Sequence, residues 1–293
     1  MVKKKNYNSV WLKSEEFWYN FWKNAEAPWR VSKGEIKFWE KKVKEIAKRE
    51  NPRALVLGAT PEIRDMLAKY KNLDVTLIDL NLQVKRAMDR AAKRKNKKEK
   101  LVKAGWLKMP LPSNYFDIVI GDGNFENIFL GKHDIFYKNI WRVVKPGGCV
   151  LMGRACLDFA FKNPLNFKGL IKKYKENPKY FKNFRNRIWM LYRTANERGV
   201  YDKRIQGVKF HVLMEKLIEA AKKEGLSNKE VKNLYWMPGL LPPNLYYIEV
   251  DIESLKKLKK MISKYFNILD IYQDLFHPIM KLKYDFILKP KKK

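Results

Sequence analysis

Residues 54–62 read Ala-Leu-Val-Leu-Gly-Ala-Thr-Pro-Glu, and this stretch decides the fold. Its first four residues are all apolar, which predicts a short strand that is buried on both faces. Gly58 begins a tight turn, where the absence of a Cβ lets the backbone come close to a ligand. A helix is expected from Pro61, with Thr60 as its N-cap and Glu62 beside the positive end of its dipole. Together these elements predict the edge of a nucleotide-type site.

Strands and helices go on alternating after this stretch. Further apolar strands are expected at residues 75–78, 101–103, 116–120 and 149–153, with helical segments between them. Five such strands predict an α/β fold with a parallel, doubly wound, Rossmann-like sheet. Because the crossovers of such a sheet are right-handed, its active crevice lies at the carboxyl ends of the strands. Residues 268–272 and 281–288 predict a terminal antiparallel hairpin.

The glycine turn lacks the pattern of a dinucleotide site. Such a site needs Gly-x-Gly-x-x-Gly, so that pyrophosphate can sit on the helix N-terminus. Here Thr60 and Ile63 stand at the second and third glycine positions, and Glu62 would repel a phosphate. S-adenosylmethionine has a sulfonium, an amino acid and an adenosine, and needs no phosphate cradle. The chemistry of the turn therefore favours S-adenosylmethionine as the cofactor and leaves an NAD-dependent oxidoreductase as a weak alternative.

Asp79 is the expected ribose ligand. It ends the second predicted strand, 21 residues after Gly58. A carboxylate about 20 residues beyond the glycine turn can accept hydrogen bonds from ribose hydroxyls. The competing interpretation is a turn aspartate that caps the next helix. We favour the ribose role because the turn, the strand and the acid agree in order and spacing.

Five pieces of the chain resemble a known family. They are residues 55–62, 77–79, 106–112, 116–123 and 141–148. On these pieces, residues 53–154 and the terminal hairpin resemble the class I S-adenosylmethionine-dependent methyltransferases. The resemblance implies a seven-stranded sheet with its last strand antiparallel, and methyl transfer as the reaction.

Eight residues are expected to line the cofactor: Gly58, Ala59, Thr60, Asp79, Leu80, Trp106, Leu107 and Asp122. No residue is assigned a catalytic role, because methyl transfer can rest on proximity and in-line alignment alone. The three histidines are too scattered to suggest a metal, so no metal site is expected.

Three positions depart from the family pattern. The family usually has an acid where Val56 stands, a second glycine where Thr60 stands, and often an acid near Gly105. These departures support an alternative of a different class, a non-catalytic nucleic-acid-binding protein on a degenerate methyltransferase fold. Cofactor binding separates the two hypotheses.

The chain divides into four expected parts. Residues 1–50 form an N-terminal helical extension, and residues 51–154 form the S-adenosylmethionine-binding core. Residues 155–245 form a helical insertion between strands five and six that serves as a substrate lid. Residues 246–293 supply a helix and the hairpin that completes the core sheet.

The composition is that of a cytoplasmic protein with a strong positive charge. No stretch approaches the roughly 20 apolar residues of a membrane span, no signal peptide is expected, and Cys149 and Cys156 form neither a disulfide framework nor a zinc motif. Lys and Arg number 63 against 31 acids, a formal net charge of +32. Such a charge attracts polyanions, so the methyl acceptor is expected to be RNA or a small molecule.

Residues 162–193 are the candidate nucleic-acid surface. They interleave cations with rings: Lys172, Lys173, Lys175, Lys179, Lys182, Arg185 and Arg187 with Tyr174, Tyr180, Phe181, Phe184 and Trp189. Cations for phosphates and rings for bases suit single-stranded nucleic acid. Amphipathic helices use the same composition for packing and solubility, and the sequence leaves both interpretations open.

Overall fold

The computed structural model describes residues 13–94, 96–128, 130–235, 248–249 and 252–292. The expected N-terminal extension, insertion and C-terminal part each include positions outside the described residues, among them 1–12 and 236–245.

A seven-stranded sheet forms the centre of the core, in the order β3-β2-β1-β4-β5-β10-β9. Its strands are β1 (Arg53–Leu57), β2 (Asp74–Asp79), β3 (Lys100–Lys103), β4 (Phe116–Asp122), β5 (Val144–Ala155), β9 (Phe266–Tyr272) and β10 (Lys283–Pro290). The first five pair in parallel, whereas β10 runs antiparallel to both β5 and β9. The Rossmann-like sheet, its antiparallel last strand and the terminal hairpin are therefore confirmed.

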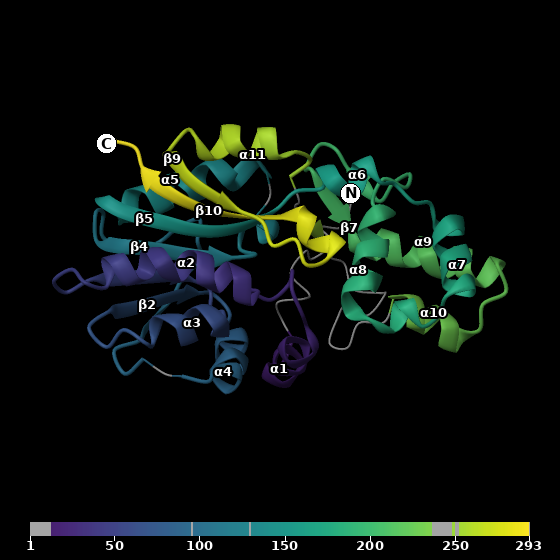
Figure 1. Cartoon of the computed structure of the whole chain (residues 1–293), viewed down its shortest axis with the longest axis horizontal. Coiled ribbons are helices and arrows are strands. Elements are labelled where there is room, and N and C mark those ends of the chain that lie inside the picture. Colours follow the sequence, from purple (N-terminus) through teal and green to yellow (C-terminus); the bar gives the residue numbers. More distant parts are fainter. Residues whose placement is uncertain (1–12, 95, 129, 236–247, 250–251, 293) are drawn as a thin grey trace, which may run out of the picture.

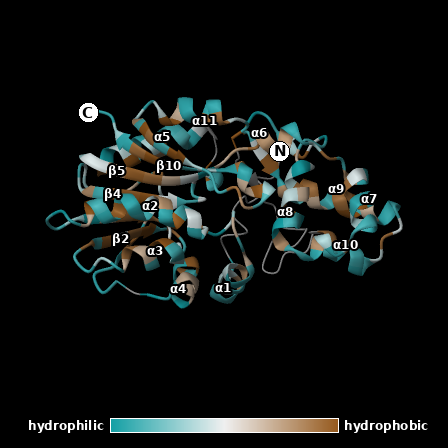
Figure 2. Cartoon of the chain, viewed as in Figure 1, coloured by the Kyte–Doolittle hydropathy of each residue, from teal (hydrophilic) through white to brown (hydrophobic). Residues whose placement is uncertain are grey.

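Helices cover both faces of this sheet (Figure 1). One face carries α2 (Lys33–Ile46), α3 (Pro61–Leu67) and α4 (Leu82–Ala91); the other carries α5 (His133–Val143) and α11 (Leu255–Ile262). Side chains of β1 alternate between the two cores, Val56 facing one and Leu55 and Leu57 the other, as the two-residue period of a strand requires. Figure 2 shows the apolar strands enclosed between helices with hydrophilic outer surfaces.

The N-terminal region is helical, as predicted. Helix α1 (Glu15–Asn24) lies against α4, where the Arg90 guanidinium stacks 3.9 Å from the centre of the Tyr19 ring. Helix α2 begins with a capping box formed by Ser32 and Glu35. Helix α3 begins at Pro61 with Thr60 as its N-cap residue, as predicted, but the Thr60 side chain makes no capping hydrogen bond.

The insertion between β5 and β9 has a hydrophobic core of its own. Its elements are α6 (Asp158–Lys162), α7 (Phe167–Glu176), α8 (Phe184–Arg193), β6 (Tyr201–Asp202), β7 (Gly207–Lys209), α9 (Phe210–Lys223), α10 (Asn228–Tyr235) and β8 (Ile248–Glu249). Leu170, Leu191 and Leu217 are among the buried residues at its centre. In Figure 1 the insertion lies to one side of the sheet, near the start of β10.

Candidate functional site

The carboxyl ends of three strands meet at Gly58. The register pairs Leu57 with Ile78 on one side and with Gly121 on the other, so the residues that follow these three lie at one level. The strand order changes direction between β1 and β4. Ligands of open α/β sheets bind at such a switch point, outside the carboxyl ends of the strands.

Three side chains converge on the glycine turn. Gly58 has a φ of +92°, a conformation that favours glycine. A Cβ placed on it would lie 3.5 Å from Asn124 Nδ2, 3.7 Å from Trp106 Cζ2 and 3.9 Å from Asp79 Oδ2. The missing Cβ thus leaves open space that these side chains border, as a close-fitting ligand would need.

Burial makes ionisation of the Asp79 carboxyl group unfavourable. Its Oδ1 accepts a hydrogen bond from the Asn81 backbone N–H at 2.8 Å, while Oδ2 is directed toward Gly58. Burial raises the pKa of Asp79 from its ordinary 3.8 to about 6, against the opposing effect of the backbone hydrogen bonds. No cation in the described residues pairs with this carboxylate, so its acceptor capacity is available to a ligand.

The apolar side of the site is formed by Trp106 and two leucines. The Trp106 indole N–H donates to the Ile78 carbonyl at 2.9 Å, which fixes the ring beside the glycine turn. Leu80 and Leu107 are 64% and 38% exposed. Leu80 lies against Gly105, where an added Cβ would come within 3.1 Å of it. An acid at position 105 would therefore press on Leu80, which gives a structural reason for the departure from the family pattern.

Ala59 and Thr60 have different surroundings. Ala59 is buried in the core beneath α3, and Thr60 is half-buried at the start of that helix. The two residues can meet a ligand chiefly through their backbone.

Asn124 belongs to this group and was not predicted. It is 4% exposed and donates from Nδ2 to the Leu57 carbonyl at 2.7 Å. Its Oδ1 has no hydrogen-bond partner among the described residues. A buried amide oxygen without a partner is costly unless a ligand supplies a donor. The only sequence signal was its position directly after Gly121-Asp122-Gly123.

Asp122 is placed differently from the other predicted site residues. Its side chain is buried, with Oδ1 at 2.7 Å from Lys283 Nζ. The same ammonium lies 2.8 Å from Glu35 Oε1. Burial raises the pKa of Glu35 and, more strongly, that of the adjoining Asp285. A Cβ on Gly153 would overlap Asp122 Oδ1 and come within 2.9 Å of Lys283 Cε, so this cluster sits in the space that the glycine leaves.

The N-terminal segment 25–35 contacts the site from outside the sheet. Arg30 forms a two-nitrogen ion pair with Glu62 Oε1 in the first turn of α3, with Nε at 2.8 Å. Trp29 stacks on Phe21 and meets Phe184 of the insertion edge-on. The Trp29 ring therefore lies between α1 and the insertion.

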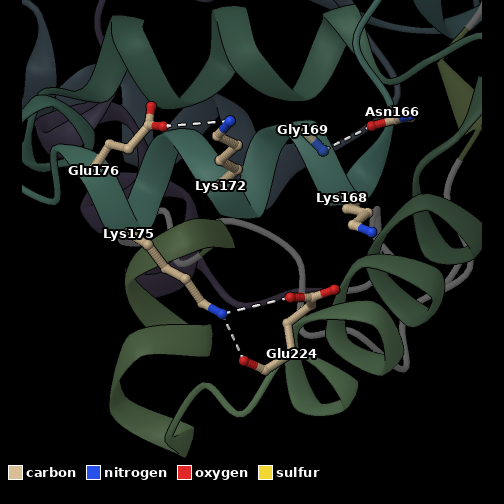
Figure 3. Close-up of a pocket in the computed structure, with 7 residues that line it drawn as sticks. All are labelled: Asn166, Lys168, Gly169, Lys172, Lys175, Glu176 and Glu224. Atoms are coloured by element: carbon tan, nitrogen blue, oxygen red, sulfur yellow. Dashed lines mark hydrogen bonds and ion pairs between the residues drawn. The ribbon is translucent and has the colours of Figure 1, made fainter.

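The structure favours the second of the two interpretations left open for residues 162–193, amphipathic packing. Four of its rings, those of Tyr174, Phe181, Phe184 and Trp189, are buried in the core of the insertion. The lysines are exposed, and Lys172 and Lys175 are among the residues that line a pocket of about 620 Å³. In Figure 3, Lys172 pairs with Glu176, and Lys175 reaches the carbonyl and carboxylate of Glu224. The composition therefore reflects amphipathic packing.

Other site types find no support in the part of the chain that is described. No group of His, Cys, Asp and Glu there could hold a metal ion. Cys149 and Cys156 are buried, and neither forms a disulfide among the described residues. No helix among the same residues is long and apolar enough to cross a membrane.

Comparison with known proteins identifies the core. A sequence model described as a methyltransferase domain matches residues 57–152, which include Gly58, Asp79, Trp106 and Asp122. The predicted family resemblance is thereby confirmed. No curated protein matches the chain.

Solved structures share the fold at low sequence identity. A methyltransferase from Methanosarcina mazei described as SAM-dependent is 14% identical, with a TM-score of 0.50 over 85% of this chain and 96% of its own. The CcbJ methyltransferase from Streptomyces caelestis is 10% identical, with a TM-score of 0.52 over 90% and 91%. A Rhodobacter sphaeroides protein described as a Zn-dependent alcohol dehydrogenase is 11% identical, with a TM-score of 0.59 over 98% and 100%. Such identities show the fold alone.

Replacing Gly153 by Ala should destabilise the protein by about 2 kcal/mol, because the new Cβ overlaps Asp122 and crowds Lys283. Gly147→Ala, on the same strand, is the matched control: its Cβ would meet nothing within 4 Å, so a change below about 0.5 kcal/mol is expected. Urea denaturation of both variants measures the difference. Equal stabilities would contradict the packing described for the cluster.

Asp79→Asn should stabilise the ligand-free protein above about pH 6. With a folded pKa near 6 and an ordinary value of 3.8, folded Asp79 binds more protons than unfolded Asp79 between these pH values. Its contribution to stability therefore falls as pH rises through that window, and Asn removes the loss. A gain of about 2 kcal/mol near pH 7 and little gain near pH 4 are expected in thermal or urea unfolding. A gain independent of pH would rule out this explanation.

Proposed function

We propose that this chain, whose core is a methyltransferase domain, transfers a methyl group from S-adenosylmethionine to an acceptor held between the core and the insertion. The observation that carries the proposal is the convergence of Asp79, Trp106 and Asn124 on the open turn at Gly58. This group lies within the residues that match the methyltransferase domain.

The residues present fit the parts of the cofactor. The Asp79 carboxylate has the acceptor capacity that two ribose hydroxyls need. The amide oxygen of Asn124 lacks a donor, which the ammonium of the methionine part would supply. Trp106, Leu80 and Leu107 offer an apolar surface for adenine. When bound, the cofactor supplies an electrophilic methyl group, and the protein aligns it with the acceptor.

The acceptor side of the site is assigned to the insertion as a substrate lid. Its α8 contacts the N-terminal segment through the Arg185–Glu26 ion pair at 2.8 Å, close to the start of β10. Because the rings of Tyr174, Phe181, Phe184 and Trp189 are buried, they are not available to stack on RNA bases, which supports a small-molecule acceptor. We further propose a cytoplasmic location, which supplies this cofactor.

Calorimetric titration with S-adenosylmethionine and S-adenosylhomocysteine tests the proposal, with NAD as the control. Micromolar binding of the first two and none of NAD are expected. Asp79→Ala should weaken binding roughly a hundredfold, since two hydrogen bonds to a charged acceptor are lost, while circular dichroism shows the fold retained. Absence of binding by all three ligands would favour the degenerate, nucleic-acid-binding alternative. Unchanged affinity in Asp79→Ala would remove the ribose assignment.

Asn124→Ala should weaken S-adenosylhomocysteine binding about tenfold, because the amide oxygen proposed for the ammonium is lost. Asn127→Ala is a matched control, since Asn127 is exposed three residues further on and bonds only its own turn. The same titration measures both variants. If Asn127→Ala reduces affinity as much as Asn124→Ala, Asn124 has no special role.

A further inference from the structure

One lysine ammonium is enclosed by three carboxyl groups below the carboxyl edge of the sheet. Lys283 Nζ lies 2.7 Å from Asp122 Oδ1 and 2.8 Å from Glu35 Oε1. Asp285, two residues along β10, adjoins them over the same glycine, Gly153. The side chains of Lys283, Asp122 and Glu35 are at most 6% exposed, and Asp285 is fully buried.

The cluster brings three carboxyl groups to one ammonium. Burial opposes the charge of Lys283, yet the attraction of Asp122 and Glu35 raises its pKa above the ordinary value, so it stays an ammonium. Burial raises the pKa of both Glu35 and Asp285, against the opposing attraction of Lys283. Of the carboxyl oxygens paired with the ammonium, Asp122 Oδ1 and Glu35 Oε1 lie at 2.7 Å and 2.8 Å.

Such a cluster is a poor way to stabilise a fold. Desolvation of buried ions offsets most of their attraction, and apolar residues of similar size often serve stability as well or better. Buried charges can instead fix one arrangement of the groups they join. The groups joined here come from distant parts of the chain.

Lys283 links the exit of β4 to the N-terminal segment. Asp122 ends β4, two residues before Asn124, and Glu35 lies in the first turn of α2. The Lys283 ammonium also donates to the Pro28 carbonyl at 3.4 Å. The Lys283 ammonium therefore contacts both the side chain of Asp122, at the end of β4, and the backbone carbonyl of Pro28, in segment 25–35.

The same segment is tied on the other side of the glycine turn. Arg30 holds Glu62 at the start of α3, and the Lys283 cluster holds Glu35 near β10. Segment 25–35 is therefore fixed to both sides of the crevice by charged contacts. Loss of Lys283 would release one side and leave the Asp122 carboxylate without its cation.

We propose that Lys283 is a positioning residue of the methyl-transfer site. Its ammonium holds the Asp122 side chain at the end of β4, next to the turn where the methyl group would be presented, and it ties segment 25–35 beside the cofactor. This inference rests on the proposed function. It assigns Asp122 to the charged, reacting end of the cofactor and away from the ribose.

Two ligands report on this arrangement without knowledge of the acceptor. S-adenosylhomocysteine is neutral at the reacting centre, whereas sinefungin has a carbon with an ammonium group in place of the methylsulfonium. A nearby ionised carboxylate favours sinefungin. The ratio of the dissociation constant of S-adenosylhomocysteine to that of sinefungin measures this preference, and it exceeds one when sinefungin binds more tightly. General damage to the fold weakens both ligands alike and leaves the ratio unmoved.

Calorimetry on the full-length protein and its variants provides the test. The unmodified protein should prefer sinefungin roughly tenfold. Lys283→Met should reduce the ratio to about one, because a buried carboxylate without its cation takes up a proton. Asp122→Asn should do the same, because an amide has no charge. Lys283→Arg keeps a cation and should restore most of the preference. Lys289→Met, an exposed lysine on the same strand, should behave like the unmodified protein.

Glu35→Gln tests the contact of Lys283 with segment 25–35 separately from its contact with Asp122. This variant remains informative if Lys283→Met does not fold. It retains an acceptor for the capping box, loosens the segment and leaves the pair of Lys283 with Asp122. It should weaken both ligands equally and keep their ratio. A ratio that stays the same or rises in Lys283→Met or in Asp122→Asn overturns the inference while the proposed function stands. Failure of the unmodified protein to bind either ligand overturns both.

Discussion

The meeting of three parallel strand ends at one glycine is the constraint on which the rest of the structure depends. Because β1 pairs with β2 on one side and β4 on the other, residues far apart in sequence come to one level beside Gly58. The positive φ and missing Cβ of this glycine keep that level open. Asp79, Trp106 and Asn124 could not border a common space with a larger residue there, and the helices on both faces serve to hold these strands in register.

The charged and polar groups of the candidate site lower the stability of the ligand-free protein. The chain as a whole has a net charge of +32, yet Asp79 is kept from cations and the carboxyls around Lys283 outnumber it. A buried carboxylate and an amide oxygen without a donor both cost free energy in the empty protein. A ligand with hydroxyl and ammonium donors repays this cost on binding. This arrangement is typical of a ligand-binding site. Packing alone would not produce the Asp79 carboxylate without a cation or the Asn124 amide oxygen without a donor.

The sequence predicted those parts of the structure that depend on short-range pattern. Apolar runs such as 54–57 and the glycine turn at Gly58 each act within a few residues, so the strands and the turn could be predicted. Asn124 and Lys283 were not predicted, because the contacts that distinguish them join different strands of the sheet. In addition, a lysine in a strand ordinarily faces solvent. The sequence left the role of the rings of residues 162–193 open for a related reason, because composition does not distinguish a ring that faces solvent from one that packs inward.

A crystal structure with bound S-adenosylhomocysteine is the most direct test of the central claim, that these strand ends form a cofactor site. The account predicts both ribose hydroxyls within hydrogen-bond distance of the Asp79 carboxylate, the adenine beside Trp106 and the amino group near Asn124 Oδ1. A ligand bound elsewhere, or bound at this edge with its ribose away from Asp79, would contradict it.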